Sequence, residues 1–140
     1  MGDTAEKLPD EPITIWAGDP DFKWEFDEIQ RAFGQVIKLW EASSVPIYHI
    51  TDMSRCTLDV DGLSKGAASA AFGPQSPWSH PKLRMVIVVT NSPAVTLAVN
   101  NIAKSASTGG IYRSTVPLLA MDSVEKALAY IREQRRSELG

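Results

Sequence analysis

Several side chains that can do acid–base or ligand-binding chemistry come directly after two apolar runs of the sequence. They are Asp52, Ser54, Thr90, Asn91 and Ser92. If both runs are parallel strands, their carboxyl ends meet at one edge of a sheet, which is where open α/β sheets commonly bind ligands. The spacing therefore predicts a site for a ligand or a partner at this edge. A small enzyme that uses Asp52, Ser54, Thr90 and Asn91 is the alternative.

A metal site is a second interpretation of the polar residues in this region. The candidate ligands are His49, Asp52, Cys56 and His80. Metal ligands must converge on one point, but two strand residues three positions apart, such as His49 and Asp52, point to opposite faces. We therefore expect no metal, and a His49 that is buried against a helix or hydrogen-bonded to the backbone. We also expect no cofactor, because GDPDFK and NSPAVT lack the glycine pattern of a phosphate-binding loop.

Covalent chemistry has little support in the sequence. Cys56 is the single cysteine, and nothing beside it provides the base or the lowered pKa that a nucleophile needs. Phosphate transfer to Asp52, as in a receiver domain, would need an acid pair and a lysine after a later strand. Asp19 and Asp21 imitate the acid pair, but the last predicted strand ends in AMD without a lysine. We therefore assign no catalytic residue.

Two features between the apolar runs each have two interpretations. Residues 62–71 are mostly glycine, alanine and serine, which suits either the close approach of a partner or ligand or tight packing of a helix on a sheet. Trp78 lies in the proline-rich loop GPQSPWSHP. An exposed tryptophan there would anchor a partner or an apolar ligand, whereas one that folds back would cover the core.

The strands that would position these residues are predicted from the hydrophobic pattern. The four predicted strands are Ile13–Ala17, Ile47–Thr51, Arg84–Thr90 and Val116–Met121. The third contains MVIVV, which is apolar on both faces and predicts a strand covered by helices on both sides. Pro117 cannot donate a hydrogen bond to a neighbouring strand, so it predicts an edge position or the start of its strand.

Helical periodicity follows each predicted strand. Apolar residues from Phe22 to Trp40 recur at three- and four-residue steps and predict a long amphipathic helix. The other predicted helices are Leu63–Phe72, one that Ser92 caps with Pro93 in its first turn, and one that begins at the aspartate-led capping box DSVE. The order βαβαβαβα predicts an α/β fold with a mostly parallel sheet of four or five strands flanked by helices.

The length and composition indicate one domain. The 140 residues divide into an arm or short extra strand at 1–12, a single α/β domain at 13–136 and a tail at 137–140. No apolar run reaches the roughly 20 residues that cross a bilayer, and the start MGDTAEKLPDE lacks the pattern of a signal peptide. We therefore expect a soluble cytoplasmic protein with no membrane span.

The net charge of −3 hides an asymmetry along the chain. Residues 1–81 contain 13 acidic and 6 basic side chains, a net of −7, whereas residues 82–140 contain 4 acidic and 8 basic side chains, a net of +4. Such polarity can orient a partner or a second copy of the chain. The late arginines fall near the end of a predicted helix, where cations complement the helix dipole, so we expect no nucleic-acid partner.

Three stretches together resemble the SpoIIAA-like and STAS group, the domains of sulfate transporters and anti-sigma factor antagonists. The stretches are HITDMSRCTLDVDGL, KLRMVIVVTNSP and DSVEKALAYIRE, and the likeness spans roughly Ile13 to Glu133. The resemblance implies a small sheet of four or five strands, which often begins with an antiparallel strand. The arm Ala5–Pro12 would supply that strand.

The signalling members of this group resemble one another in a DSSGL-like helix start whose serine is phosphorylated by a partner kinase. Here Val60 and Asp61 occupy that neighbourhood, and Ser64 lies just beyond it. The resemblance favours the SpoIIAA-like branch, whose members commonly lack the serine. Our hypothesis is a non-enzymatic regulatory or ligand-binding homodimer that takes a small apolar or lipid-like ligand or a regulatory protein. A phosphorylation-controlled anti-sigma factor antagonist that uses Ser64 is the alternative.

Overall fold

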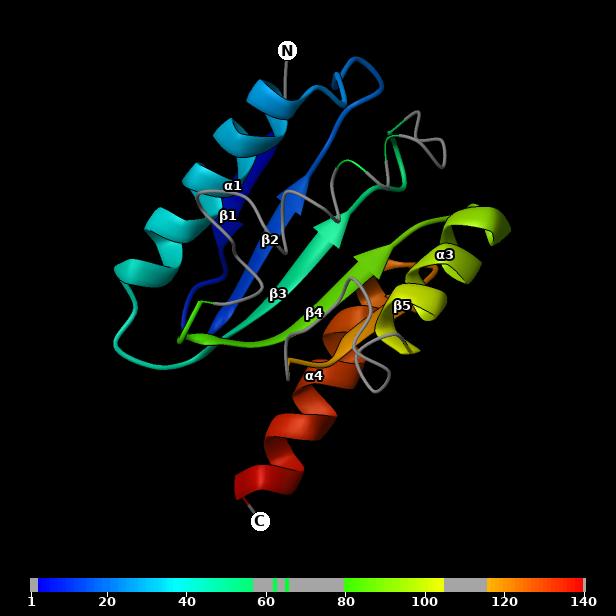
Figure 1. Cartoon of the computed structure of the whole chain (residues 1–140). Coiled ribbons are helices and arrows are strands. Elements are labelled where there is room, and N and C mark those ends of the chain that lie inside the picture. Colours follow the sequence, from blue (N-terminus) through cyan, green and yellow to red (C-terminus); the bar gives the residue numbers. More distant parts are fainter. Residues whose placement is uncertain (1–2, 57–61, 63–64, 66–79, 105–115, 140) are drawn as a thin grey trace.

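Five strands form one sheet, in the order in which they follow along the chain (Figure 1). The computed structural model describes residues 3–56, 62, 65, 80–104 and 116–139. The strands are β1 (Thr4–Lys7), β2 (Ile13–Ala17), β3 (Ile47–Asp52), β4 (Leu83–Val89) and β5 (Leu118–Met121). β1 is antiparallel to β2, and β2 to β5 are parallel to one another. The predicted, mostly parallel sheet is confirmed, and its antiparallel strand lies in the arm.

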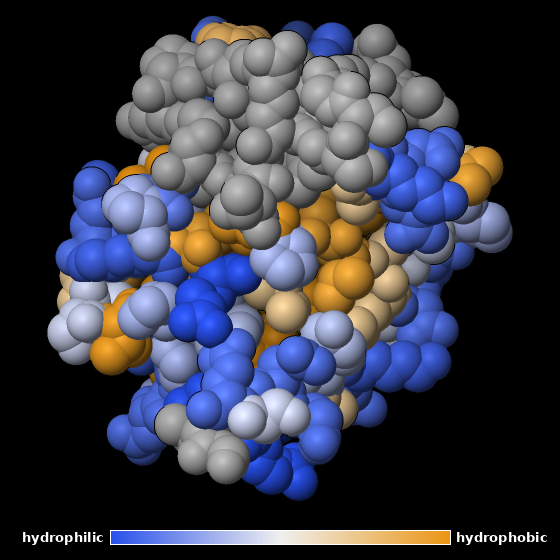
Figure 2. Space-filling view, turned by 60° about the horizontal axis from the view of Figure 1, so that its bottom comes forward, coloured by the Kyte–Doolittle hydropathy of each residue, from blue (hydrophilic) through white to orange (hydrophobic). Residues whose placement is uncertain are grey.

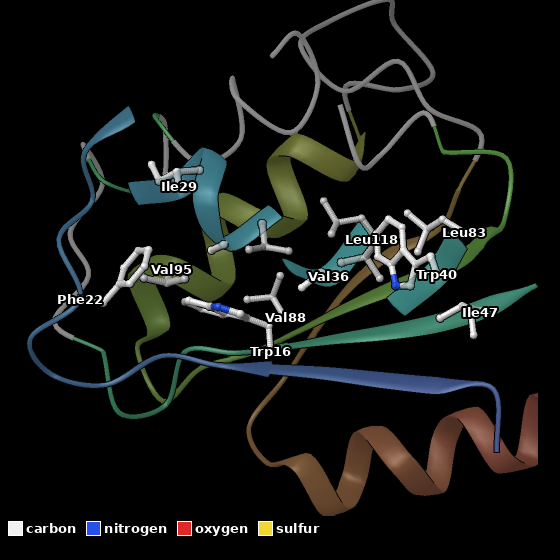
Figure 3. Close-up of a cluster of buried hydrophobic side chains, with 13 residues drawn as sticks. Trp16, Phe22, Ile29, Val36, Trp40, Ile47, Leu83, Val88, Val95 and Leu118 are labelled. Atoms are coloured by element: carbon white, nitrogen blue, oxygen red, sulfur yellow. The ribbon is translucent and has the colours of Figure 1, made fainter. Parts of the chain in front are cut away.

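Helices cover both faces of the sheet. In the described part of the chain they are α1 (Phe26–Glu41), α3 (Pro93–Lys104) and α4 (Val124–Leu139). α1 and α3 lie on one face and α4 on the other (Figures 1 and 3). Right-handed crossovers between strands in sequential order place their helices on the same face, whereas the helix after the last strand is free to pass to the other. The α/β fold is confirmed, and the predicted helix Leu63–Phe72 falls, apart from Lys65, outside the described residues.

Two hydrophobic clusters, one on each face, hold these layers together. Side chains alternate along β4, so Val86 and Val88 join the cluster under α1 and α3, while Ile87 and Val89 join the cluster under α4. Figure 3 shows the first cluster between the sheet and the two helices. The prediction that MVIVV is buried on both faces is confirmed, and it explains why so few polar residues interrupt this strand.

The apolar periodicity that predicts the first helix begins before the helix does. α1 starts at Phe26, whereas Phe22 lies in a turn in which its N–H donates to the Asp19 carbonyl oxygen at 3.2 Å. The Phe22 ring nevertheless reaches the core, where it packs edge-on against Trp16 with ring centroids 5.1 Å apart. A buried side chain at helical spacing can therefore come from the loop that leads into a helix.

The helix caps agree with the sequence for α3 and differ by one residue for α4. Ser92 Oγ accepts a hydrogen bond from Val95 N at 3.2 Å, as predicted. At α4 the capping side chain is Ser123, whose Oγ accepts from Lys126 N at 3.1 Å. Asp122 and Ser123 are both good capping residues, so residue type alone does not choose between them. The choice of Ser123 follows from how α4 packs, since the first turn must be placed so that Ala127 is buried on the sheet.

β5 begins later than the sequence predicts. Pro117 precedes its first residue, and the Pro117 carbonyl oxygen accepts a hydrogen bond from Val86 N at 3.0 Å. Proline can accept but cannot donate such a bond, so it fits at the start of an outer strand, as expected. At the other end of the chain, α4 continues to Leu139 and makes residues 137–139 helical.

The edge strand β1 is anchored by a buried carboxylate. Asp3 Oδ2 accepts a hydrogen bond from Trp16 Nε1 at 2.7 Å, and Asp3 Oδ1 accepts one from Arg31 at 2.6 Å. Burial acts to raise the pKa of Asp3, but the hydrogen bonds from Arg31 and Trp16 outweigh it and lower the pKa. Asp3 thus ties the arm to β2 and α1 as a charged group.

Candidate functional site

The structure brings the predicted polar residues together at the carboxyl ends of β3 and β4. Asp52 is paired with Val89 in the sheet register, and Met53 N donates to the Val89 carbonyl oxygen at 2.8 Å. The segments 52–54 and 90–92 therefore leave the sheet side by side. We call these two segments the carboxyl-edge turns. Trp78 and Ser64, the other predicted positions, lie outside the described residues.

Most polar groups of the carboxyl-edge turns are bonded within the turns themselves. Asp52 Oδ1 accepts from Ser54 N at 3.0 Å and from Ser54 Oγ at 2.6 Å. Thr90 Oγ1 accepts from Ser92 N at 3.1 Å, and Ser92 caps α3. Aspartate, serine and threonine form such local bonds in many turns. Asn91 is exposed. The formation of these two turns is therefore enough to explain why aspartate, serine and threonine occur here.

Cys56 lies at the same edge but is poorly suited to nucleophilic chemistry. A methyl group on the buried Gly18 would overlap Cys56 Sγ and the Trp16 ring, so the thiol is closely packed. Burial and the nearby carboxylates Asp52, Asp19 and Asp3 raise the pKa of Cys56 to about 11. The thiol is thus protonated at neutral pH, which supports the expectation of a structural cysteine.

His49 is enclosed in the core, as expected. Its Nδ1 lies 2.9 Å from Thr14 Oγ1, which also accepts a hydrogen bond from Trp40 Nε1 at 2.9 Å. The Trp40 ring of α1 packs edge-on against the imidazole, and burial lowers the pKa of His49 to about 3. Within residues 3–56, 80–104 and 116–139, no three histidine, cysteine or acidic side chains are placed to hold a metal ion.

A pocket of about 380 Å³ lies at the opposite edge of the sheet, where no site is predicted from the sequence. We call it the amino-edge pocket. It is formed by the turn between β1 and β2, the segment before β3, the start of β4 and the end of α4. Its apolar lining consists of Pro12, Val45, Pro46 and Tyr48. Figure 2 brings forward the side of the molecule with the amino ends of β2 to β4, where hydrophobic residues gather near the middle of the view and hydrophilic residues lie around them.

Two ion-pair groups hold the end of α4 against the walls of this pocket. Glu11 accepts hydrogen bonds from Arg132 Nε at 3.0 Å and from its terminal nitrogen at 2.8 Å, and Arg132 lowers the pKa of Glu11. Glu138 accepts from Tyr48 Oη at 2.8 Å and from Arg84 at 2.7 Å. Burial, followed by the bond to Glu138, raises the pKa of Tyr48. The pairs connect helix, turn and strands into one pocket rim.

The turn between β1 and β2 shapes the mouth of the pocket. Leu8 N donates to the Ile13 carbonyl oxygen at 2.9 Å, which closes the turn. Asp10 adopts a φ of 62° within it. Aspartate tolerates this left-handed region better than most residues because its short side chain makes local hydrogen bonds. The Asp10 carboxylate is exposed at the pocket.

The sequence does not reveal this pocket, because its residues come from four distant segments. Tyr48 and Glu138, for example, are 90 positions apart. The one available signal was the charge asymmetry, with an acidic first part and a basic last helix. In the structure these opposite charges meet within the molecule, where they pair at the pocket rim.

A comparison with solved structures defines the class of fold. The chain is similar to the crystal structure of an uncharacterised protein of the DUF3478 family with a SpoIIAA-like fold, from Shewanella loihica PV-4. The TM-score is 0.56 and the identity 8%, and the match covers 91% of this chain and 90% of the other. No protein-family model and no curated protein matches the sequence. The protein therefore has a SpoIIAA-like fold, as its sequence resemblance implies.

The described helices were also compared with the requirements of a membrane span. None of them combines the length and the apolar character that crossing a bilayer requires.

Proposed function

We propose that the protein is a non-enzymatic ligand-binding module of the SpoIIAA-like type and that the amino-edge pocket is its binding site. One observation carries this proposal: a pocket of about 380 Å³ combines an apolar lining with charged groups that hydrogen bonds hold in place. Small-molecule sites commonly have this composition, a largely apolar surface with a few positioned polar groups.

The state of the two reactive side chains supports a binding role. The Cys56 pKa of about 11 keeps the thiol protonated at neutral pH. The His49 ring is fully buried, with a pKa of about 3, and its Nδ1 is bonded to Thr14. The Cys56 thiol is not prepared to act as a nucleophile, because it is not ionised at neutral pH. The His49 ring is not prepared to act as a general base, because a substrate at the surface cannot reach it.

A fragment screen by two-dimensional NMR tests the binding site. We expect a subset of small fragments to shift the backbone amides of residues 7–11, 45–48 and 135–138 in a saturable way. The amides of the carboxyl-edge turns, at 52–54 and 90–92, serve as the internal control and are expected to shift less. If no fragment shifts the pocket amides, the proposal that the amino-edge pocket is the binding site is wrong.

The proposal includes a homodimer that acts in the cytoplasm. Its support is the position of β1 at the edge of the sheet, where among the described strands it pairs with β2 alone. A free strand edge can pair with another chain. Native mass spectrometry is expected to show twice the mass of the chain, and a spectrum of monomer alone would contradict the homodimer.

A further inference from the structure

Both glutamates of the amino-edge pocket are already hydrogen-bonded within the protein. Each Glu11 carboxylate oxygen accepts a bond from Arg132, at 3.0 and 2.8 Å. Each Glu138 oxygen likewise has a donor, Tyr48 on one side and Arg84 on the other, at 2.8 and 2.7 Å. Their negative charges are therefore largely compensated by protein groups and contribute little attraction for a cationic ligand.

Two cations at the pocket have donors to spare. Lys7 Nζ donates to the Leu8 carbonyl oxygen at 3.2 Å, which uses one of its three N–H groups. Within the described chain, Arg135 is paired with Glu11 Oε2 at 3.9 Å, which is beyond hydrogen-bond distance. Among the described residues, Asp10 is the pocket carboxylate that forms no ion pair. The pocket groups with hydrogen-bonding capacity left for a ligand thus include two cations, Lys7 and Arg135, and one carboxylate, Asp10.

The apolar wall sets the character of the rest of a ligand. Val45 is 49% exposed although it is a large aliphatic residue, and Pro46 lies beside it. The Tyr48 ring lines the same pocket, with the Arg84 guanidinium 6.0 Å from its centroid. A volume of about 380 Å³ is near the lower end for small-molecule sites, so it suits a compact body and excludes a long acyl chain.

We infer that the amino-edge pocket binds a small monocarboxylate with a compact apolar body. Arg135 and Lys7 hold the carboxylate, and Val45 and Pro46 contact the apolar body. Asp10, the pocket carboxylate without an ion pair, opposes a second negative charge, so a monoanion is favoured over a phosphate dianion. This inference rests on the proposed function and adds the chemical class of the ligand to it.

The inference is tested by NMR titration with four probes that share one tail. They are 3-phenylpropanoate, 3-phenylpropanol, 3-phenylpropylamine and 3-phenylpropyl phosphate. We expect the carboxylate to shift the pocket amides with an affinity at least about tenfold above that of the alcohol and the amine, because only the carboxylate satisfies the free donors. The phosphate is expected to bind more weakly than the carboxylate at pH 8, where it carries two charges.

Variants in α4 and in the turn between β1 and β2 locate the carboxylate contact. Arg135→Gln is expected to weaken binding of 3-phenylpropanoate by about tenfold, and Asp10→Asn to strengthen it severalfold. Arg136→Gln is the matched control, because Arg136 is an exposed arginine of the same helix that pairs with Glu133 and does not line the pocket. Its affinity should remain within about twofold of the parent protein. Urea midpoints verify that each variant is folded.

The outcomes separate this inference from the proposed function. Three results would overturn the inference that the ligand is a monocarboxylate while leaving the pocket as a binding site. They are equal binding of the alcohol, preference for the amine or the phosphate, and an unchanged affinity of Arg135→Gln. If none of the four probes binds, the inference of a monocarboxylate is also overturned. The broader fragment screen then decides whether the pocket binds other chemistry or no ligand.

Discussion

At the residue scale, His49 shows how burial converts an apparent reactive group into part of the core. Its Nδ1 lies 2.9 Å from Thr14 Oγ1, and Trp40 packs against its ring. Removing the ring from water disfavours the charged form, so burial lowers the pKa to about 3 from 6.5. The native protein therefore keeps this histidine neutral under conditions in which the unfolded chain protonates it.

This difference predicts a pH dependence of stability. Well above pH 6.5 neither state is protonated at His49, and His49 adds no pH dependence. As the pH falls from 6.5 toward 3, the unfolded state binds a proton that the native state excludes, so the free energy of unfolding decreases by up to about 1.4 kcal/mol per pH unit. Between pH 6 and pH 5 we expect a loss of about 1 kcal/mol in urea denaturation.

The variant His49→Gln removes the titrating group and is expected to flatten this slope. The window between pH 6 and pH 5 lies above the range in which Asp3 and Glu11 act, because their pKa values are lowered from 3.8 and 4.5 and their stabilising effect is lost at more acidic pH. His80→Gln is the control: burial also lowers the pKa of His80, but this ring is only partly buried. An unchanged slope in His49→Gln would show that another group causes the pH dependence.

Cys56 makes a second prediction at this scale. The raised pKa of about 11, against 9.0 for a free thiol, reduces the thiolate fraction at pH 8 by about 100-fold. We expect iodoacetamide to modify the native protein about 100-fold more slowly than the urea-denatured chain at this pH. Mass spectrometry over time measures both rates, and similar rates would contradict a buried, protonated thiol.

At the scale of elements, one hydroxyl group joins three of them. Thr14 of β2 accepts a hydrogen bond from Trp40 of α1 and lies beside His49 of β3, all in the interior. A buried polar group that loses its partner costs about 1–3 kcal/mol. The contact therefore fixes how α1 sits across β2 and β3, in addition to the hydrophobic packing around it.

Removing that hydroxyl tests this account. Thr14→Val keeps the shape of the side chain but leaves Trp40 Nε1 and His49 Nδ1 without their partner, and we expect a loss of about 2 kcal/mol in the free energy of unfolding. Thr14→Ser keeps the hydroxyl and loses one methyl group, with an expected loss of about 1 kcal/mol. If Thr14→Val is as stable as Thr14→Ser or more stable, packing contributes more than the hydrogen bonds at this position.

At the scale of the whole molecule, stability is expected to decline from the centre of the sheet outward. β3 and β4 are flanked by strands on both sides, and their side chains are buried on both faces. β1 is a short edge strand with mostly exposed residues. Local opening costs most where backbone bonds and apolar contacts are both buried.

Hydrogen exchange measures this gradient directly. We expect the amides of β3 and β4 to exchange slowest and at rates that approach global unfolding, those of β2 and β5 to be intermediate, and those of β1 to be fastest. Exchange followed by NMR at neutral pH gives the order, at a protein concentration low enough for the chain to be monomeric. Protection in β1 equal to that in β4 under these conditions would contradict the gradient, whereas β1 protection that rises with protein concentration is what the proposed homodimer predicts.

Much of the architecture follows from local patterns in the chain. The doubly apolar run of β4, the cap formed by Ser92 and the position of Pro117 each depend on a few neighbouring residues, and each is confirmed. The start of α1 and the cap of α4 were predicted less well. Both depend on how the helix packs, since Phe22 fills the core from a turn and Ala127 sets the phase of the last helix.

Of the candidate site, too, one part follows from local sequence and another depends on contacts between distant segments. The sequence places Asp52 and Thr90 after neighbouring strands, because the end of an apolar run is a local feature. It does not show that their side chains bond within the carboxyl-edge turns, nor that Glu11 meets Arg132 and Glu138 meets Arg84 at the amino-edge pocket. By itself, the sequence determined the order and type of the elements through local spacing. Only the tertiary structure decided which charges remain unpaired beside an apolar wall, because that depends on contacts between segments far apart in the chain.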